Sequence, residues 1–198
     1  MLADMPLLRA FIYETLRLFP PIPQLVNRRC EDGRVLWLPV APADRSDSGG
    51  AGSGMVPVSI PAGTYVGWSA YALHRSRFNT SWSSFGDDTT LSTHGLGKGS
   101  EVATAFLPER WGSTTVEIEA TARRARDRGE LMTFHAGARA CLGQKFAMTE
   151  LMIVVVHMLA AFEIRPQTDR DGTEAEVTMT PGGLLRPLQV PVELVVLA

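Results

Sequence analysis

Apolar positions recur at three- and four-residue steps near the start of the chain, which is the spacing of one face of an α-helix. This face is formed by Leu8, Phe11, Ile12, Thr15, Leu16 and Phe19. Pro20 and Pro21 follow at once. A proline cannot continue a helix, and it pushes the preceding residue towards an extended conformation. The pattern therefore predicts a helix that ends at about Phe19.

Short runs rich in β-branched and aromatic residues come next, at 34–40, 55–63 and 64–73, and each predicts a strand. The first two flank a Gly/Ser/Asp-rich stretch, which predicts an irregular loop at about 41–55. A second polar stretch predicts another irregular loop, lying on the surface, at about 76–104.

The last part of the chain contains its longest apolar run, residues 151–162. We expect it to belong to a buried helix from about Gly143 to Ala161, because the run is too short for a bilayer, which needs ~20 residues. The preceding stretch, 114–130, is charged and is expected to be exposed. Further strands are predicted at 161–166, 174–181 and 190–197. The whole pattern indicates an α+β fold, mainly helical, without regular βαβ alternation.

Composition narrows the classes of function. The 198 residues are 45% hydrophobic with a formal net charge of -2, enough for one sizeable core and too balanced to suggest nucleic acid as a partner. The two cysteines, Cys30 and Cys141, are expected to be free thiols in a reducing compartment. No secretory signal or membrane segment is expected, so the polypeptide as given should be soluble, or at least should not anchor itself in a membrane.

One cysteine lies at the mouth of the predicted helix that begins at about Gly143. Unpaired backbone N–H groups and the helix dipole stabilise an anion there, so Cys141 is suited to act as a thiolate ligand. Gly137 permits a tight or left-handed turn before it, and Arg139 is a fixed cation suited to a carboxylate. The alternative is a buried structural cysteine, which is the usual role of a lone cysteine.

This segment resembles the cytochrome P-450 family of haem-thiolate monooxygenases. Its motif, Phe-x-x-Gly-x-Arg-x-Cys-x-Gly, is matched at Phe134, Gly137, Arg139, Cys141 and Gly143. The resemblance implies haem b as the cofactor, with Cys141 as the iron ligand and Arg139 on a propionate. It also implies that Phe134 shields the sulfur from water and that Gly143 leaves room for the flat macrocycle.

Two further motifs agree with the resemblance. Glu14 and Arg17 lie at i and i+3 on one helix face, where they can pair, and Arg110 occupies the arginine position of a Pro-Glu-Arg-Trp motif. In the family these three side chains form a buried ion-pair network that holds the cysteine loop in place. Taken alone, Glu14 and Arg17 would more often be an ordinary surface pair.

Weaker signals leave alternatives open. Arg29, or nearly as well Arg28, matches an arginine that often binds the second haem propionate in the family, although a solvated arginine is an equally fair interpretation. His74 and Arg75 resemble a family pair near the haem edge, but for His74 a satisfied structural role is favoured.

The resemblance also implies a reaction, the insertion of one oxygen atom of O2 into an apolar organic substrate. Electrons would come from NADPH through a reductase partner, at the endoplasmic reticulum membrane in a full-length member. The loop at about 41–55 is similar to that of fungal enzymes that hydroxylate alkanes and fatty acids. Apolar residues in stretches that line the family's substrate pocket are equally well explained by core packing; they are Ile22, Leu25, Val26, Leu184 and Leu185.

The resemblance covers residues 1–198 as a partial domain, the C-terminal part of the family's fold. The distal helix of the family, with the acidic residue and threonine that deliver protons, has no counterpart in these residues, so no catalytic residue is predicted. We expect the chain to be inactive alone. The alternative is a non-catalytic remnant, or a haem-binding or interaction fragment.

Overall fold

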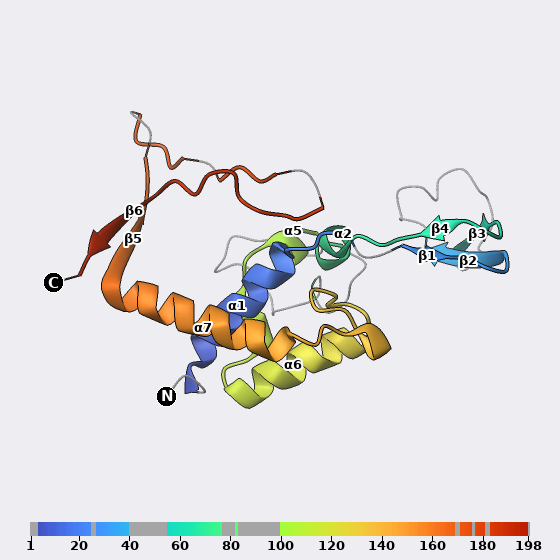
Figure 1. Ribbon diagram of the computed structural model, residues 1–198, viewed down its shortest axis with the longest axis horizontal. Helices are drawn as coiled ribbons and strands as arrows, with labels where there is room; N and C mark the ends of the chain where they lie inside the picture. The colour runs from blue at the N-terminus through green and yellow to red at the C-terminus, as the bar shows by residue number, and fades with distance from the viewer. Residues whose placement is uncertain are drawn as a thin grey trace. The chain divides into compact units, whose positions relative to one another are not determined.

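The computed structural model describes residues 4–24, 27–39, 55–76, 82, 100–168, 171–175, 177–180 and 183–197. They belong to two units, Leu25–Trp68 and the remainder, Met1–Gln24 with Ser69–Ala198. Figure 1 shows the elements of both units. Helices predominate and the strands form small two-stranded sheets, which confirms the α+β, mainly helical fold.

The unit Leu25–Trp68 consists of two antiparallel ribbons. Both strands predicted at 34–40 and 55–63 form. Strand β2 (Arg34–Pro39) pairs with β3 (Met55–Ile60), with Leu36 opposite Val58. The shorter ribbon pairs β1 (Arg28–Arg29) with β4 (Tyr65–Val66). The loop expected at about 41–55 lies outside the described residues except for Met55, which belongs to β3.

The third predicted strand, 64–73, was wrong in its second half. After β4 the chain forms a short helix, α2 (Ala70–His74), in the other unit. The side chain of Ser69 accepts a hydrogen bond from the backbone N–H of Ala72, at 3.1 Å. This N-cap satisfies an N–H that would otherwise lack a partner, and it starts a helix where aromatic residues suggested a strand.

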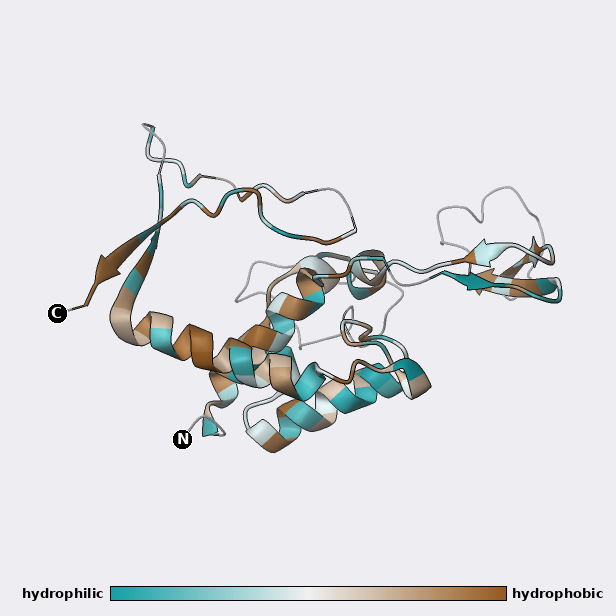
Figure 2. Cartoon of the chain, viewed as in Figure 1, coloured by the Kyte–Doolittle hydropathy of each residue, from teal (hydrophilic) through white to brown (hydrophobic). Residues whose placement is uncertain are grey.

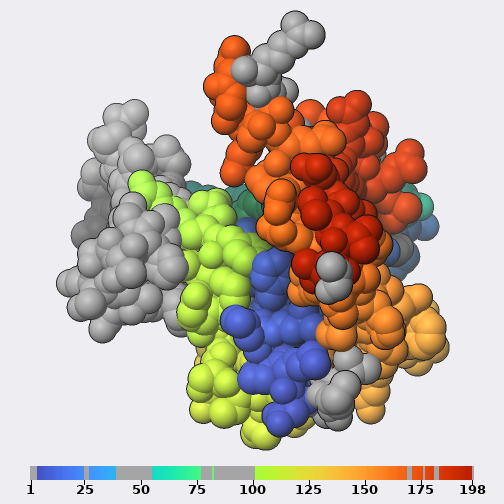
Figure 3. All heavy atoms as spheres, turned by 90° about the vertical axis from the view of Figure 1, so that its left-hand side faces the viewer, coloured from blue at the N-terminus to red at the C-terminus, as the bar shows by residue number. Residues whose placement is uncertain are grey.

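Three longer helices build the core of the unit formed by Met1–Gln24 and Ser69–Ala198. They are α1 (Pro6–Leu18), α6 (Thr115–Asp127) and α7 (Gln144–Ala161). Figure 3 shows α1 between the segment from residue 100 onward on one side and α7 on the other. Two buried tryptophans lie at the centre, with ring centroids 5.2 Å apart, namely Trp82 and Trp111 of the 3-10 turn η3 (Pro108–Trp111).

Helix α6 is only partly exposed, in contrast to the prediction for 114–130. Ile118, Ala122 and Ala125 are buried against the core at helical spacing, while the arginines between them lie outside. Thr114 and Glu117 form a capping box at its start. The many charged residues of this stretch made it look exposed, but one isoleucine and two alanines at helical spacing form a narrow apolar stripe that is sufficient for helix packing.

Helix α7 begins one residue after the predicted start, but the prediction that it is buried was wrong. Among its 18 residues only Met148 and Met152 are buried. Figure 2 shows apolar residues around much of the helix, and among the described residues neighbours cover only one side. By length and composition α7 could also cross a bilayer. We had excluded a membrane span because the apolar run 151–162 is too short, but the helix is longer than that run. Core helices of soluble proteins meet the same criterion.

The end of the chain forms one further ribbon. Strands form at two of the predicted places, and β5 (Phe162–Pro166) pairs with β6 (Val192–Val196). The strand expected at 174–181 is absent from the described residues there, which make only isolated bridges. The irregular loop at about 76–104 lies mostly outside the described residues. The prediction of a surface loop was wrong at its end, where α5 (Ser100–Thr104) forms, and at Trp82, which is buried.

Candidate haem-thiolate site

The loop that carries Cys141 is closed by its own backbone. The N–H of Cys141 donates to the carbonyl of Phe134 at 2.8 Å, and the intervening residues include a 3-10 turn, η4 (Gly137–Arg139). Gly137 has a φ of 64° and His135 a φ of 59°. Two left-handed residues within three positions reverse the chain tightly, which fits the turn that the sequence predicted at Gly137.

The sulfur of Cys141 lies on an open face at the start of α7. The residue is an exposed free cysteine, and its neighbour Leu142 is fully exposed. A Cβ atom at Gly143 would have Cys141 Sγ, at 3.9 Å, as its one neighbour within 4 Å. Residue 143 therefore places no side chain beside the sulfur.

The other residues predicted to contact the haem, Phe134, Arg139 and Arg29, lie in different surroundings. The Phe134 ring packs against the main core, so the described contact with Cys141 runs through its carbonyl. Arg139 is exposed and has no hydrogen bond or ion pair with any described residue. Arg28 and Arg29 lie on β1 in the other unit, and successive side chains of a strand point to opposite faces. Arg29 remains a prediction for a propionate.

The three charged residues of the predicted network meet in the interior. Glu14 and Arg17 are fully buried, and Arg17 forms a two-pronged ion pair with Glu14 in which Nε and Nη2 each lie 2.8 Å from a carboxylate oxygen. Arg110 Nε donates to Glu14 Oε1 at 3.0 Å. Neutral donors complete the shell of the carboxylate, because Trp111 Nε1 and the N–H of Leu107 bind it at 3.0 and 2.9 Å.

Backbone carbonyls take the remaining guanidinium donors. Arg17 donates to the carbonyls of His74, Ala103 and Ala105, at 2.7, 2.6 and 3.0 Å. Arg110 reaches the carbonyl of Trp82 at 3.0 Å, and that of Val102 at 2.9 Å. The network therefore joins α1, α2, α5, η3 and Trp82 through one buried carboxylate and two buried cations.

The charges of this network persist despite burial. Burial by itself raises the pKa of Glu14, but the hydrogen bonds and positive charge of Arg17, with the charge of Arg110, outweigh it and hold that pKa below its ordinary value. Burial lowers the pKa of Arg110 to about 10, although the charge of Glu14 opposes this. Glu14 and Arg110 are consequently ionised at neutral pH.

His74 connects the network to the cysteine loop, a role that sequence reasoning did not identify. Its Nε2 accepts the backbone N–H of Met132 at 2.8 Å, and its Nδ1 lies 2.8 Å from the carbonyl of Arg17. Since Nε2 accepts, the proton of the neutral ring is on Nδ1, which donates to that carbonyl. Thr133 adds a second tie, from Oγ1 to the carbonyl of Leu16 at 3.1 Å. The structural role favoured for His74 is confirmed.

Comparisons with known proteins place the chain in a family. The sequence model described as Cytochrome P-450 matches residues 101–192. Cytochrome P-450-DIT2 of Saccharomyces cerevisiae is 33% identical over 193 residues, which cover 96% of this chain and 30% of that protein. Cytochrome P-450 monooxygenase xanG of Aspergillus fumigatus is 35% identical over 159 residues, covering 80% and 23%. The chain belongs to the cytochrome P-450 family.

A solved structure supports the fold assignment. The crystal structure of a cytochrome P-450 superposes on 96% of this chain and 31% of its own, with a TM-score of 0.56 and 23% sequence identity. The chain thus spans about a third or less of the length of the relatives named here. Activity, substrate and partners of a whole cytochrome P-450 therefore remain proposals for these residues.

The donor set fits the haem of this family. No group of three or more His, Cys, Asp or Glu side chains in the described parts of the chain could hold a metal ion by itself. A single thiolate is nevertheless sufficient when a porphyrin supplies the other nitrogen ligands of the iron. Cys141 offers such a thiol, exposed just ahead of α7, with no side chain at residue 143 to exclude a macrocycle.

The protonation of His74 predicts a pH dependence of stability. Burial lowers the pKa of His74 to about 4 from 6.5, although its bond to the Arg17 carbonyl opposes the shift. The unfolded chain therefore binds this proton more readily, and stability present above pH 6.5 is lost as the pH falls towards 4. We expect the free energy of unfolding to fall by about 2 kcal/mol from pH 7 to pH 5 through this residue.

Urea unfolding of the wild type and of His74→Gln at both pH values measures this contribution. The variant should be less stable at pH 7, because Met132 and Arg17 lose their partner, and it should lack the His74 part of the decline. An equal decline in the two proteins would contradict the assignment.

The left-handed turn at Gly137 predicts a modest, specific cost of adding a side chain. No atom lies within 4 Å of a Cβ built on Gly137, so Gly137→Ala meets no clash and the strain comes from its φ of 64°. We expect a loss of about 1 kcal/mol in the free energy of unfolding, and a smaller loss for Gly137→Asn. Gly183→Ala is the matched control, since residue 183 is equally open and is not left-handed. Equal effects at both glycines would contradict this account.

Proposed function

We propose that this chain supplies the proximal, thiolate-bearing side of a haem-dependent monooxygenase. The observation that carries the proposal is the exposed Cys141 just ahead of α7, on a loop tied through Met132 and His74 to the buried ion-pair network and through Thr133 to α1. The haem, when bound, would supply the oxygen chemistry, since thiolate ligation favours cleavage of the O–O bond.

Each residue of the chain has a limited task in this proposal. Cys141 would ligate the iron, Arg139 would pair with a propionate, and Gly143 would leave the macrocycle room. Arg139 supports its role by being exposed and without a partner among the described residues. Arg29 would bind the second propionate. Glu14, Arg17 and Arg110 would act as scaffold, holding the loop without touching the haem.

The finer parts of the proposal rest on family resemblance. The substrate would be an apolar organic molecule, of the alkane or fatty-acid type if the loop at about 41–55 has the role of its fungal counterpart. Electrons would come from NADPH through a reductase, at the endoplasmic reticulum membrane. The predicted pocket residues Leu25 and Val26 lie outside the described residues. Ile22 and Leu184 are exposed, and Leu185 donates its N–H to the Pro21 carbonyl, which brings two of these stretches together.

Reconstitution tests the haem site directly. Purified chain is mixed with haemin, reduced and treated with CO, and its spectrum is recorded. A red-shifted, thiolate-type Soret band is expected; a band typical of free or histidine-bound haem would contradict the proposal.

Turnover separates an enzyme from a haem-binding fragment. The reconstituted chain is incubated with NADPH, a cytochrome P-450 reductase and a long-chain fatty acid, and hydroxylated product is measured by mass spectrometry. Product above the level of free haemin would support catalysis by the chain itself. A thiolate-type spectrum without product would support the alternative, a fragment that binds haem without turnover.

A further inference from the structure

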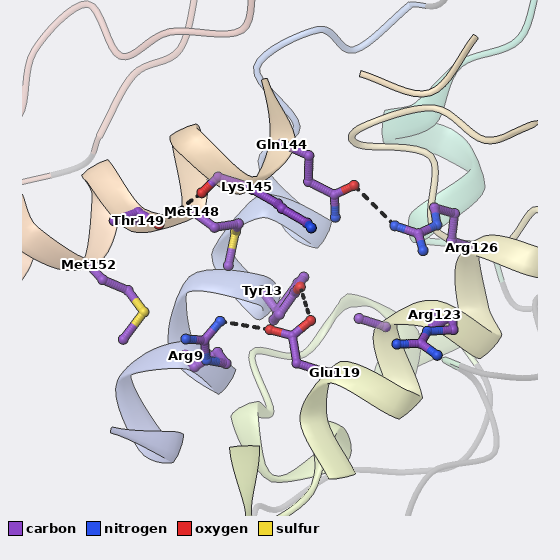
Figure 4. Close-up of a pocket in the computed structure, with 11 residues that line it drawn as sticks. Arg9, Tyr13, Glu119, Arg123, Arg126, Gln144, Lys145, Met148, Thr149 and Met152 are labelled. Carbon is purple, nitrogen blue, oxygen red and sulfur yellow. Dashed lines mark hydrogen bonds and ion pairs between the residues drawn. The ribbon is translucent and has the colours of Figure 1, made fainter. Parts of the chain in front are cut away.

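A cavity lies among α1, α6 and α7, with a volume of about 390 Å³. Its walls carry Arg9 and Tyr13 from α1, Glu119, Arg123 and Arg126 from α6, and Lys145 from α7, as Figure 4 shows. None of the residues Phe134–Gly143 lines it. This cavity, the basic pocket, is therefore separate from the haem-thiolate site.

Charge in the basic pocket is unbalanced. Four cationic side chains line it, and Glu119 is the one carboxylate among the lining residues. Glu119 is already engaged, since it accepts from Arg9 Nη1 at 2.7 Å and from the hydroxyl of Tyr13 at 3.0 Å. After this pairing the pocket keeps an excess of three positive charges.

The three excess cations lack carboxylate partners within the described chain. Arg126 donates to the neutral amide oxygen of Gln144 at 3.0 Å, which orients the guanidinium but leaves its charge unbalanced. The side chains of Arg123 and Lys145 have no ion pair with a described residue. In addition, Arg9 Nε is buried and has no hydrogen-bond partner among the described residues, and the Arg9 side chain as a whole is only 17% exposed.

Such an arrangement favours a compact anion of more than one negative charge. Like charges gathered in one cavity repel, and a bound anion removes that repulsion while accepting the free N–H groups. Guanidinium groups match the oxygens of phosphate in a two-pronged geometry. A volume of about 390 Å³ also lies within the range of small-molecule sites.

We propose that the basic pocket binds a phosphate or pyrophosphate group, either free or carried by an organic molecule. Arg123, Arg126 and Lys145 would contact the anion. Glu119 would stay paired with Arg9 and hydrogen-bonded to Tyr13, so that this part of the pocket wall has no net charge. This does not depend on haem binding, because no residue of the cysteine motif takes part.

Calorimetric titration of the 198-residue chain with inorganic pyrophosphate tests the proposal. Each titration is run at constant ionic strength, with chloride as the balancing anion. Saturable binding is expected, and Arg126→Gln and Lys145→Gln should each raise the dissociation constant about tenfold, because each removes one charge-assisted contact. Glycerol phosphate as a second ligand distinguishes an organic phosphate from the free ion.

Arg124→Gln is the matched control. Arg124 lies on the same helix as Arg126, and its substitution removes the same charge. Arg124 does not line the pocket, however, and it donates to Thr121 Oγ1. It should leave the dissociation constant unchanged. Circular dichroism of each variant confirms that its helices are intact.

Three results would overturn the proposal. The first is the absence of saturable pyrophosphate binding, and the second is equal weakening by Arg124→Gln and Arg126→Gln, which would indicate a diffuse positive surface. The third is binding of an acidic peptide in a titration where pyrophosphate fails, which would make the pocket a protein-docking surface.

Discussion

Glu14→Gln should lower the free energy of unfolding by about 3–5 kcal/mol, because it strands two buried cations. The carboxylate is fully buried and accepts five hydrogen bonds, two from Arg17 and one each from Arg110, Trp111 and Leu107. Glutamine has nearly the same shape but no charge, and its amide NH2 would face the guanidinium donors. The loss therefore comes from uncompensated charge rather than from a cavity.

Urea unfolding followed by circular dichroism measures this effect. The matched control is Glu163→Gln, which also removes a carboxylate from an arginine pair; its partner Arg165 lies 2.7 Å away and both side chains are about half exposed. No measurable change is expected there, since water replaces the lost partner. A Glu14→Gln protein as stable as the Glu163→Gln protein would show that the buried network does not hold the fold together.

The network also shows how far the sequence alone could predict this site. The i, i+3 spacing of Glu14 and Arg17 follows from helix geometry, and the structure confirms the pair. Arg110 lies 96 residues from Glu14, and only the family motif indicated that the two meet. The donors Trp111 and Leu107 were missed, because a contact formed by folding leaves no local periodicity.

His74 was missed as a link for a related reason. A lone histidine after an expected strand gives no sign of which atoms its two nitrogens will meet. In the structure α2 replaces that strand, and the ring bridges carbonyl and N–H groups that are 57 and 58 residues away. The prediction of a satisfied structural histidine was correct in kind, while its partners required the fold.

The errors in the helices have a common physical origin. In α6 the charged residues outnumber the buried stripe of Ile118, Ala122 and Ala125, so composition suggested exposure. In α7 apolar residues surround the helix, and this pattern predicted burial on all sides. The partners needed for such burial are a property of neighbouring elements, which the local pattern does not specify.

Cys141→Ala should abolish the thiolate-type Soret band of the reduced, CO-treated chain while leaving the fold intact. The sulfur is the proposed iron ligand, and no other residue from Phe134 to Gly143 carries a thiol. The residue is exposed, and its hydrogen bonds to other described residues are made by the backbone, which alanine retains. The free energy of unfolding without haem should therefore change by no more than about 0.5 kcal/mol.

Cys30→Ala provides the matched control, because Cys30 is the second free thiol of the chain. It lies in the unit Leu25–Trp68, next to β1, and its thiol donates a hydrogen bond to the carbonyl of Asp32, at 3.6 Å. This variant should keep the thiolate-type band at full intensity. If Cys30→Ala removed the band and Cys141→Ala kept it, the iron ligand would be Cys30. If both variants kept it, neither thiol would be the sole ligand, and the helix-mouth geometry of Cys141 would have no role in binding the cofactor.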